Sequence, residues 1–140
     1  MALRITESEF HHVIALLHSM LVEAGLGAWE IDPWLTKAKA RLTQDHRIGS
    51  GAYFVEYRGD TPIGMAGAQL RDYHAFLSFK TGRYGCVIDE YVLPSYRGQG
   101  IEHRLRVEAT AWLRQATDIV LDAAAPNIAR LAASSGGGKL

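Results

Sequence analysis

Two glycines separated by one residue lie between an apolar segment and a helical pattern, an arrangement that can hold an anion. Gly98 and Gly100 permit a sharp turn and let a ligand approach the backbone amides closely. The first turn of the following helix leaves N–H groups without partners, and these groups carry partial positive charge. With Arg97 beside the turn, the segment could bind a phosphate or a diphosphate. The same glycines would also suit a strand–turn–helix connection that binds nothing.

The segments before and after this turn predict a strand and a helix. Residues 87–93 are mainly apolar types that suit a pleated, partly buried strand. Pro94 lacks an N–H group and fixes its own φ, so strand pairing should stop there. The following segment carries apolar side chains at the spacing of one helical face: Ile101, Leu105, Ala109, Trp112 and Leu113.

Two common phosphate-binding loops do not match this segment. The P-loop requires Lys followed by Ser or Thr after its last glycine, and here Ile101 and Glu102 follow. The dinucleotide-binding fingerprint requires a third glycine at the position that His103 occupies. A nucleotide-hydrolase loop and a Rossmann loop are therefore both excluded.

The segment closely resembles the acetyl-CoA loop of the GCN5-related N-acetyltransferase (GNAT) superfamily, whose pattern runs Val-x-Pro-x-x-Arg-Gly-x-Gly-Ile-Gly at the end of the fourth strand. This chain supplies the following residues in register: Val92, Pro94, Arg97, Gly98, Gly100 and Ile101. It departs at Glu102, where the family usually has Gly or Ala. The resemblance covers about residues 3–131 and implies an α/β (α+β) fold, with a mixed, mostly antiparallel twisted sheet flanked by helices.

The resemblance also implies the cofactor, acetyl-CoA, and the residues that contact it. These are Val92, Leu93, Arg97, Gly98, Gln99, Gly100, Ile101, Glu102, His103 and Asn127. Asn127 follows Pro126 at the start of a predicted short helix, where family members place an Asn that bonds the pantetheine arm. Asn is also a good cap for any helix, and His103 could equally lie on the surface.

Direct acetyl transfer needs a neutral amine, a polarised thioester carbonyl and a proton for the departing sulfur. The resemblance implies that a backbone N–H near Val92 polarises the carbonyl. Asp89 and Glu90 are the candidate bases, because acids are unusual inside an apolar strand. Asp89 is favoured because polyamine-type members carry a functional acid at its place. One of the two acids could instead pair with an Arg while the other lies in solvent.

Strand alternation predicts that these two acids point to opposite faces of the sheet. Asp89 is expected on the face of Val87 and Tyr91, and Glu90 on the opposite face with Ile88 and Val92. Only one of the acids can then reach the reacting centre.

The proton donor is less determined by the sequence. Many family members place a Tyr about seven residues after the Asn, where this chain has Ser134. Tyr91, Tyr96 or water could replace it. The alternative is a GNAT-fold protein that binds CoA with impaired catalysis and serves regulation or assembly.

The acceptor, a primary amine of a small molecule or a protein, is expected between the helix–helix region and the loops across the sheet. Trp29, Glu30 and Tyr73 are the candidate contacts. Trp29 and Trp34 could instead pack a helical corner, with Glu30 in solvent.

The remaining segments predict one GNAT-like domain over residues 1–133 and a flexible Gly/Ser tail over residues 134–140. The family's sixth and seventh strands are expected to be absent. The exposed edge of the fifth strand would then be covered by the tail or by a second subunit, as in a homodimer. The other expected elements are a strand at 3–5, a capping box at Thr6 and Glu9, a helix at 10–24, a helix starting at Asp32-Pro33, a hairpin at 52–70 and a strand at 118–121.

Composition excludes several other classes of protein. Lys plus Arg equals Asp plus Glu at 15 each, which argues against nucleic acid or an anionic membrane as a partner. No apolar run approaches the length of a membrane span, and the single cysteine, Cys86, favours a cytoplasmic protein. The six histidines show no metal-binding spacing, so no metal is expected.

Overall fold

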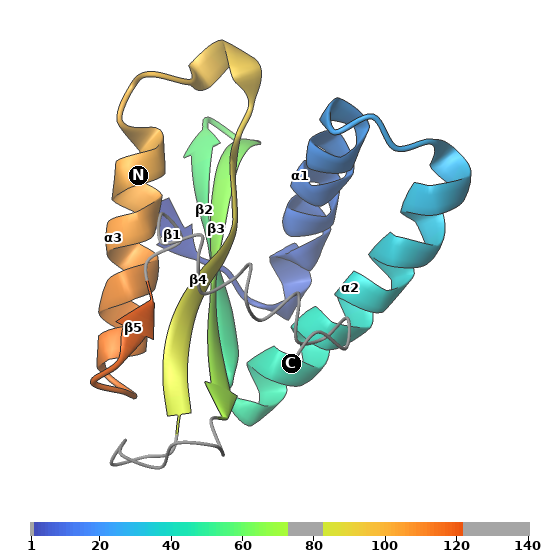
Figure 1. The fold of residues 1–140 in the computed structure, drawn as a ribbon. Coiled ribbons are helices and arrows are strands. Elements are labelled where there is room, and N and C mark those ends of the chain that lie inside the picture. Colours follow the sequence, from blue (N-terminus) through green and yellow to red (C-terminus); the bar gives the residue numbers. More distant parts are fainter. Residues whose placement is uncertain (1, 73–82, 122–140) are drawn as a thin grey trace, which may run out of the picture.

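A computed structural model of the chain describes residues 2–72 and 83–121. Its sheet has the order β1-β2-β3-β4-β5, with antiparallel pairing from β1 to β4 and parallel pairing between β4 and β5. The strands are β1 (Ala2–Arg4), β2 (Gly51–Arg58), β3 (Thr61–Asp72), β4 (Arg83–Val92) and β5 (Val120–Leu121). This mixed, mostly antiparallel sheet confirms the predicted fold class (Figure 1).

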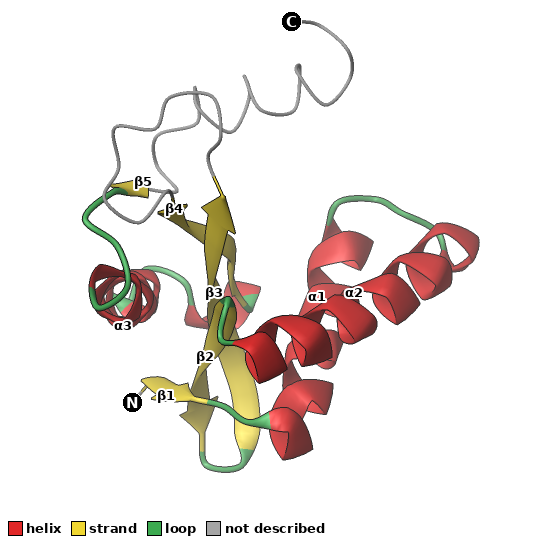
Figure 2. Cartoon of the chain, turned by 90° about the horizontal axis from the view of Figure 1, so that it is seen from below, coloured by secondary structure: helices red, strands yellow, loops and turns green. Residues whose placement is uncertain are grey.

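Helices cover both faces of the sheet, so the molecule has three layers (Figure 2). α1 (Phe10–Glu23) and α2 (Ala28–Ile48) lie on one face, and α3 (Ile101–Arg114) lies on the other. The core under α3 contains Phe54, Ile63, Ala66, Val87, Val92, Ile101, Leu105, Ala109 and Leu113. The core under α1 and α2 contains Val13, Leu17, Leu42, Tyr53, Val55, Met65 and Tyr91.

The predicted helical stripes account for these two cores. On α3, four of the five expected residues are buried, and Trp112 packs partly buried against the same core. On α1, a short 3-10 turn at Glu7–Glu9 precedes the helix, and the Thr6 N–H donates to Glu9 Oε1 at 3.3 Å, as the capping-box pattern predicts.

The predicted start of the second helix is wrong. Instead of beginning at Asp32-Pro33, α2 begins at Ala28 and contains Pro33 inside it. The Gly27 N–H donates to Glu30 Oε1 at 3.1 Å, and this cap allows the helix to start one turn earlier. Glu30 therefore caps the first turn of α2.

The β2–β3 hairpin forms as predicted, and its glycines have a packing role. A Cβ atom at Gly67 would lie 2.8 Å from Cζ of Tyr53 and 2.9 Å from Cγ1 of Ile88. A Cβ atom at Gly64 would lie 3.1 Å from Val92, on the face that α3 covers. These two positions let large side chains lie directly against the sheet.

β5 pairs with only the first part of β4, at Gly85 with Val120 and Cys86 with Leu121. Within the described residues, β5 adds no partner to the later half of β4. The predicted tail at 134–140, the predicted helix at Pro126 and the expected absence of the sixth and seventh strands all concern residues outside those that the structure describes. No helix in the part of the chain that the structure describes is long and apolar enough to cross a membrane.

Candidate functional site

The two glycines of the motif form the connection between β4 and α3. The Leu93 N–H donates to Ile63 O at 2.8 Å, and a 3-10 turn at Pro94–Tyr96 then leaves the sheet. Gly98 and Gly100 follow with φ of +79° and +82°, the left-handed conformation that glycine adopts without strain. We call Arg97–Gly100 the glycine loop. It ends where α3 begins at Ile101.

The backbone N–H groups from Gly98 to His103 face no acceptor among the described residues. A Cβ atom at Gly98 would meet nothing within 4 Å, and one at Gly100 would meet only Nη1 of Arg104, at 4.0 Å. Donors at the positive end of a 14-residue helix, with no side chain in the way, suit a phosphate or diphosphate. The residues present therefore fit the diphosphate of a coenzyme.

A cavity of about 260 Å³ lies beside the glycine loop. Its lining residues are Glu90, Tyr91, Val92, Arg97, Glu102 and Arg106. The structure thus brings together five of the residues that the sequence singled out, from β4, the loop and α3. We call this space the loop cavity.

Other predicted contacts lie around this cavity in different settings. Gln99 and His103 are exposed, while Leu93 is half-buried. Ile101 is 1% exposed and packs in the core under α3, so only its backbone remains for a ligand. Tyr73 and Asn127 lie outside the described residues.

Arg97 is held by two protein groups. Its Nε donates to Val92 O at 2.8 Å, and its Nη2 donates to Glu23 Oε1 at 2.8 Å. Its guanidinium also lies 5.4 Å from the centre of the Tyr91 ring, and the Tyr91 hydroxyl donates to Glu23 Oε1 at 2.8 Å. The hydrogen bond from Arg97, followed by that from Tyr91, holds the pKa of Glu23 below its usual value. Sequence reasoning missed Glu23, because nothing in a single sequence joins it to a residue so far along the chain.

Glu90 forms an ion pair with a residue that the sequence analysis did not assign. Nε and Nη2 of Arg106 donate to its two carboxylate oxygens at 2.8 and 3.1 Å. This two-point contact occupies both oxygens of the Glu90 carboxylate. The expectation that one acid pairs with an Arg therefore applies to Glu90.

A β-bulge in β4 changes the faces predicted for the strand. β3 pairs Gly64 with Val92 and Met65 with Tyr91, but Gly67 pairs with Ile88, so an extra residue stands in β4. Asp89 has φ of +53° at this bulge. Asp89 consequently shares its face with Ile88 and Tyr91, toward α1 and α2, while Glu90 shares the α3 face with Val92. The predictions that Asp89 shares a face with Val87, and Glu90 with Ile88, were wrong, because they assumed regular alternation along the whole strand.

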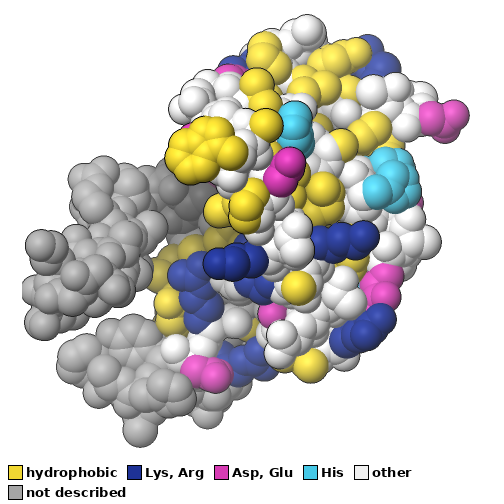
Figure 3. Space-filling view, turned by 90° about the vertical axis from the view of Figure 1, so that its right-hand side faces the viewer, with side chains coloured by type: hydrophobic (Ala, Val, Ile, Leu, Met, Phe, Trp, Pro, Cys, Tyr) yellow, Lys and Arg dark blue, Asp and Glu magenta, His cyan; other side chains and the backbone are white. Residues whose placement is uncertain are grey.

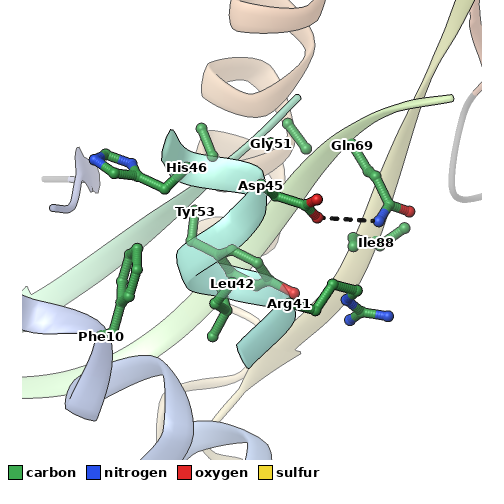
Figure 4. A pocket seen from close by; sticks show the side chains of 11 residues that line it. Phe10, Arg41, Leu42, Asp45, His46, Gly51, Tyr53, Gln69 and Ile88 are labelled. Atoms are coloured by element: carbon green, nitrogen blue, oxygen red, sulfur yellow. Dashed lines mark hydrogen bonds between the residues drawn. The ribbon is translucent and has the colours of Figure 1, made fainter. Parts of the chain in front are cut away.

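Asp89 accepts a hydrogen bond from the hydroxyl of Tyr53. Tyr53 is 6% exposed, and burial, with the negative charge of Asp89 as the next cause, raises its pKa well above the usual value. Its ring passes beside Gly67 and lines a cavity of about 10 Å³, room for about one water, together with Arg41 and Asp45 (Figure 4). Tyr53 thus fixes the position of the favoured acid from a second strand.

The acceptor candidates on α2 lie at its beginning. Trp29 is 80% exposed, so it does not pack a helical corner, and Trp34 is 37% exposed. Glu30 caps the helix. The α1–α2 connection, which leads to Trp29 at the start of α2, lies at the same end of the sheet as the glycine loop (Figure 1).

The side of α1 and α2 is not uniformly acidic. Lys and Arg side chains gather across the middle of this face (Figure 3). α2 contributes the exposed cations Lys37, Lys39, Arg41 and Arg47. Asp89 and Glu23 are therefore acids within a mixed charge field.

Comparison with known proteins identifies one family. The model of the acetyltransferase (GNAT) family matches residues 16–133. No curated protein sequence matches the chain.

Solved structures of similar fold cover nearly the whole chain. A GCN5-related N-acetyltransferase from Ralstonia eutropha has a TM-score of 0.74 at 21% identity, covering 97% of this chain and 90% of that one. A predicted acetyltransferase with acetyl-CoA from Clostridium acetobutylicum has a TM-score of 0.69 at 19% identity, covering 87% and 79%. An aminoglycoside antibiotic 6'-N-acetyltransferase from Acinetobacter haemolyticus has a TM-score of 0.64 at 19% identity, covering 97% and 88%.

Proposed function

Because the chain belongs to the acetyltransferase (GNAT) family, we propose that it transfers an acetyl group from acetyl-CoA to a primary amine. The observation that carries this proposal is the set of N–H groups at Gly98–His103 that face no acceptor among the described residues. These donors form a place for the diphosphate of the coenzyme. Acetyl-CoA bound there supplies an activated acetyl thioester.

In this proposal, the coenzyme binds at one face of β4 and the acceptor approaches from the other. Val92 and Glu90 lie on the α3 side, next to the loop cavity, where the coenzyme is expected. Asp89 and Tyr91 lie on the side of α1 and α2, from which the acceptor is expected to approach. The thioester carbonyl of acetyl-CoA would then lie beside β4, where the coenzyme and the acceptor amine meet.

Asp89 is the proposed base, because Glu90 is committed to Arg106. The amine nitrogen attacks the carbonyl carbon, the carbon–sulfur bond breaks, and Asp89 takes the proton that the nitrogen loses. The Tyr53 hydroxyl donates to the Asp89 carboxylate and holds it in one orientation. Tyr91 donates to Glu23, so water is the proposed source of the proton for sulfur.

A small-molecule amine is the proposed acceptor class. One structural neighbour is an aminoglycoside antibiotic 6'-N-acetyltransferase, which supports a small acceptor. The exposed Trp29 could cover an apolar part of such a molecule.

Calorimetric titration with acetyl-CoA tests the cofactor site directly. Gly100→Asp places a carboxylate among the proposed phosphate donors and should weaken binding about a hundredfold, about 2.7 kcal/mol. Gly59→Asp is the matched control, because Gly59 also has positive φ (+62°) and open surroundings but lies in the β2–β3 turn. Equal affinities of the two variants for acetyl-CoA would show that the coenzyme binds away from the glycine loop.

Thiol release across a panel of primary amines tests catalysis. Asp89→Asn should lower turnover by about 10²–10⁴-fold with little change in acetyl-CoA affinity, as expected for a lost general base. Binding of acetyl-CoA with no thiol release by any amine would favour a CoA-binding protein without catalysis.

A further inference from the structure

The last residue of α1 is an acid at the end of the helix where an acid is least favourable. Carbonyl groups give a helix C-terminus partial negative charge, so Glu23 is repelled there unless a cation offsets it. Arg97 supplies that cation at 2.8 Å, from the glycine loop. The pair joins α1 to the connection between β4 and α3, which lie at the same end of the molecule (Figure 1).

Arg97 is positioned to bind an anion even without Glu23. Its Nε is fixed on Val92 O at 2.8 Å, and its guanidinium lies against the Tyr91 ring. These contacts set the direction of the guanidinium, while Nη2 makes the contact with the Glu23 carboxylate. Replacing the carboxylate by another anion would leave the anchor on Val92 intact.

The Glu23 carboxylate and a bound diphosphate would lie close to the same guanidinium. Arg97 directly precedes Gly98, where the N–H groups without described acceptors begin, and it lines the loop cavity. Two anions at one cation repel each other, and they also compete for its N–H donors.

On the basis of the acetyl-CoA site proposed above, we propose that Glu23 is an internal competitor that the coenzyme diphosphate displaces from Arg97. In the free protein, the carboxylate accepts hydrogen bonds from Arg97 and Tyr91. On binding, the diphosphate takes the place of the Glu23 carboxylate at Nη2 of Arg97, and the carboxylate turns away from Arg97 while it keeps the hydrogen bond from Tyr91. Coenzyme binding therefore loosens the link between the end of α1 and the glycine loop. Since α1 leads into the connection toward Trp29, the acceptor side becomes freer once the coenzyme is in place.

Titration of the full chain with CoA tests this competition. Glu23→Gln removes the charge and keeps the size of the side chain, so CoA should bind about three- to tenfold tighter at low salt. The gain should shrink as salt increases. Pantetheine, which lacks the diphosphate, should show no gain.

Glu7→Gln is the matched control. Glu7 pairs with Arg47 at 2.7 Å, and its side chain is 39% exposed, compared with 43% for Glu23. Both substitutions remove one negative charge and one Arg ion pair, but only Glu23 touches the glycine loop. Glu7→Gln should leave CoA affinity within about twofold of wild type.

A double variant isolates the route through Arg97. In an Arg97→Met background, Glu23→Gln should tighten CoA binding by less than about twofold, because the donor for which the two anions compete is gone. Thermal unfolding of each variant checks that the fold is retained.

The outcomes separate this proposal from the one it builds on. If wild type binds CoA and Gly100→Asp does not, but Glu23→Gln binds like wild type or more weakly, the competition is refuted and the cofactor site stands. A gain that persists in the Arg97→Met background also refutes it. Absence of CoA binding by both wild type and Glu23→Gln overturns both proposals.

Discussion

The glycines of β3 and those of the glycine loop are the same residue type in opposite settings. Around Gly67, the space for a Cβ atom is filled by Tyr53 and Ile88, at 2.8 and 2.9 Å. Around Gly98, nothing lies within 4 Å of that space. The strand glycine has a packing role, whereas the loop glycine keeps a backbone surface accessible.

Stability and ligand binding can thus depend on different glycines within one small domain. A side chain added to β3 must displace buried atoms, so its effect should appear in the free energy of unfolding. A side chain added to the loop meets solvent or ligand, so its main effect should appear in affinity. Substitutions at the two kinds of glycine should therefore give different losses, in stability at Gly67 and in CoA affinity at Gly98.

The largest expected effect on stability is that of Gly67→Ala. The methyl group would push against the buried Tyr53 ring, and the free energy of unfolding should fall by about 1–3 kcal/mol. Urea denaturation followed by circular dichroism measures this change. CoA affinity of the folded fraction should stay close to wild type. An unchanged unfolding midpoint would mean that the Tyr53 ring moves aside without penalty.

Gly98→Ala should show the reverse pattern. Its φ of +79° strains any residue with a Cβ atom, so stability should fall by about 1 kcal/mol. Gly59→Ala, with φ of +62° in the β2–β3 turn, should lose about as much. Only Gly98→Ala should also weaken CoA binding, about tenfold by calorimetry, because its methyl group intrudes on the proposed diphosphate site. Equal CoA affinity in the two variants would contradict the ligand role of the loop.

Tyr53, the buried residue that packs against Gly67, should cause a loss of stability at alkaline pH. Burial, and then Asp89, raise the pKa of Tyr53 well above its usual 10.0, so the folded protein keeps a proton that the unfolded chain releases. Tyr53 therefore contributes its full stabilisation below pH 10, and that contribution is lost as pH rises above 10. Wild type should therefore lose stability through Tyr53 as pH rises above 10.

Tyr53→Phe should reduce this alkaline loss. Urea denaturation at pH 8, 10 and 11 gives the comparison, and the pH 8 value gives the pH-independent effect of losing the hydrogen bond to Asp89. If Tyr53→Phe lost as much stability as wild type between pH 8 and 11, the loss would come from other tyrosines.

The smallest expected effect is that of Glu102→Gln, at the family's usual Gly or Ala position. Glu102 lies in the first turn of α3, where its charge stabilises the helix but repels a diphosphate. Removing the charge should tighten CoA binding about threefold and lower stability by about 0.3–0.5 kcal/mol. Weaker CoA binding would show that Glu102 helps to hold the coenzyme.

Much of the fold was predictable because its signals are local. The hairpin at 52–70, the stripe on α3 and the stop at Pro94 depend on near neighbours in the chain, and the structure confirms each of them. The glycine loop was found for the same reason, since its residues are contiguous.

The remaining features depend on distant contacts or on small irregularities. Glu23 and Arg106 each meet a predicted residue from another element, which spacing along the chain does not show. The bulge at Asp89 shifts the pairing register of β4 by one residue, and no residue type in the sequence predicts it. The early start of α2 was missed because Pro33 gives a stronger signal than the cap by Glu30.

The positive φ of Asp89 limits which residues natural variation can place at the proposed base. Gly, Asn, Asp and His are the types that tolerate this backbone conformation best, and only Asp and His among them can accept a proton. Glu would preserve the charge but would meet backbone strain. The bulge in the strand thus narrows the bases that this position can carry without backbone strain to Asp and His.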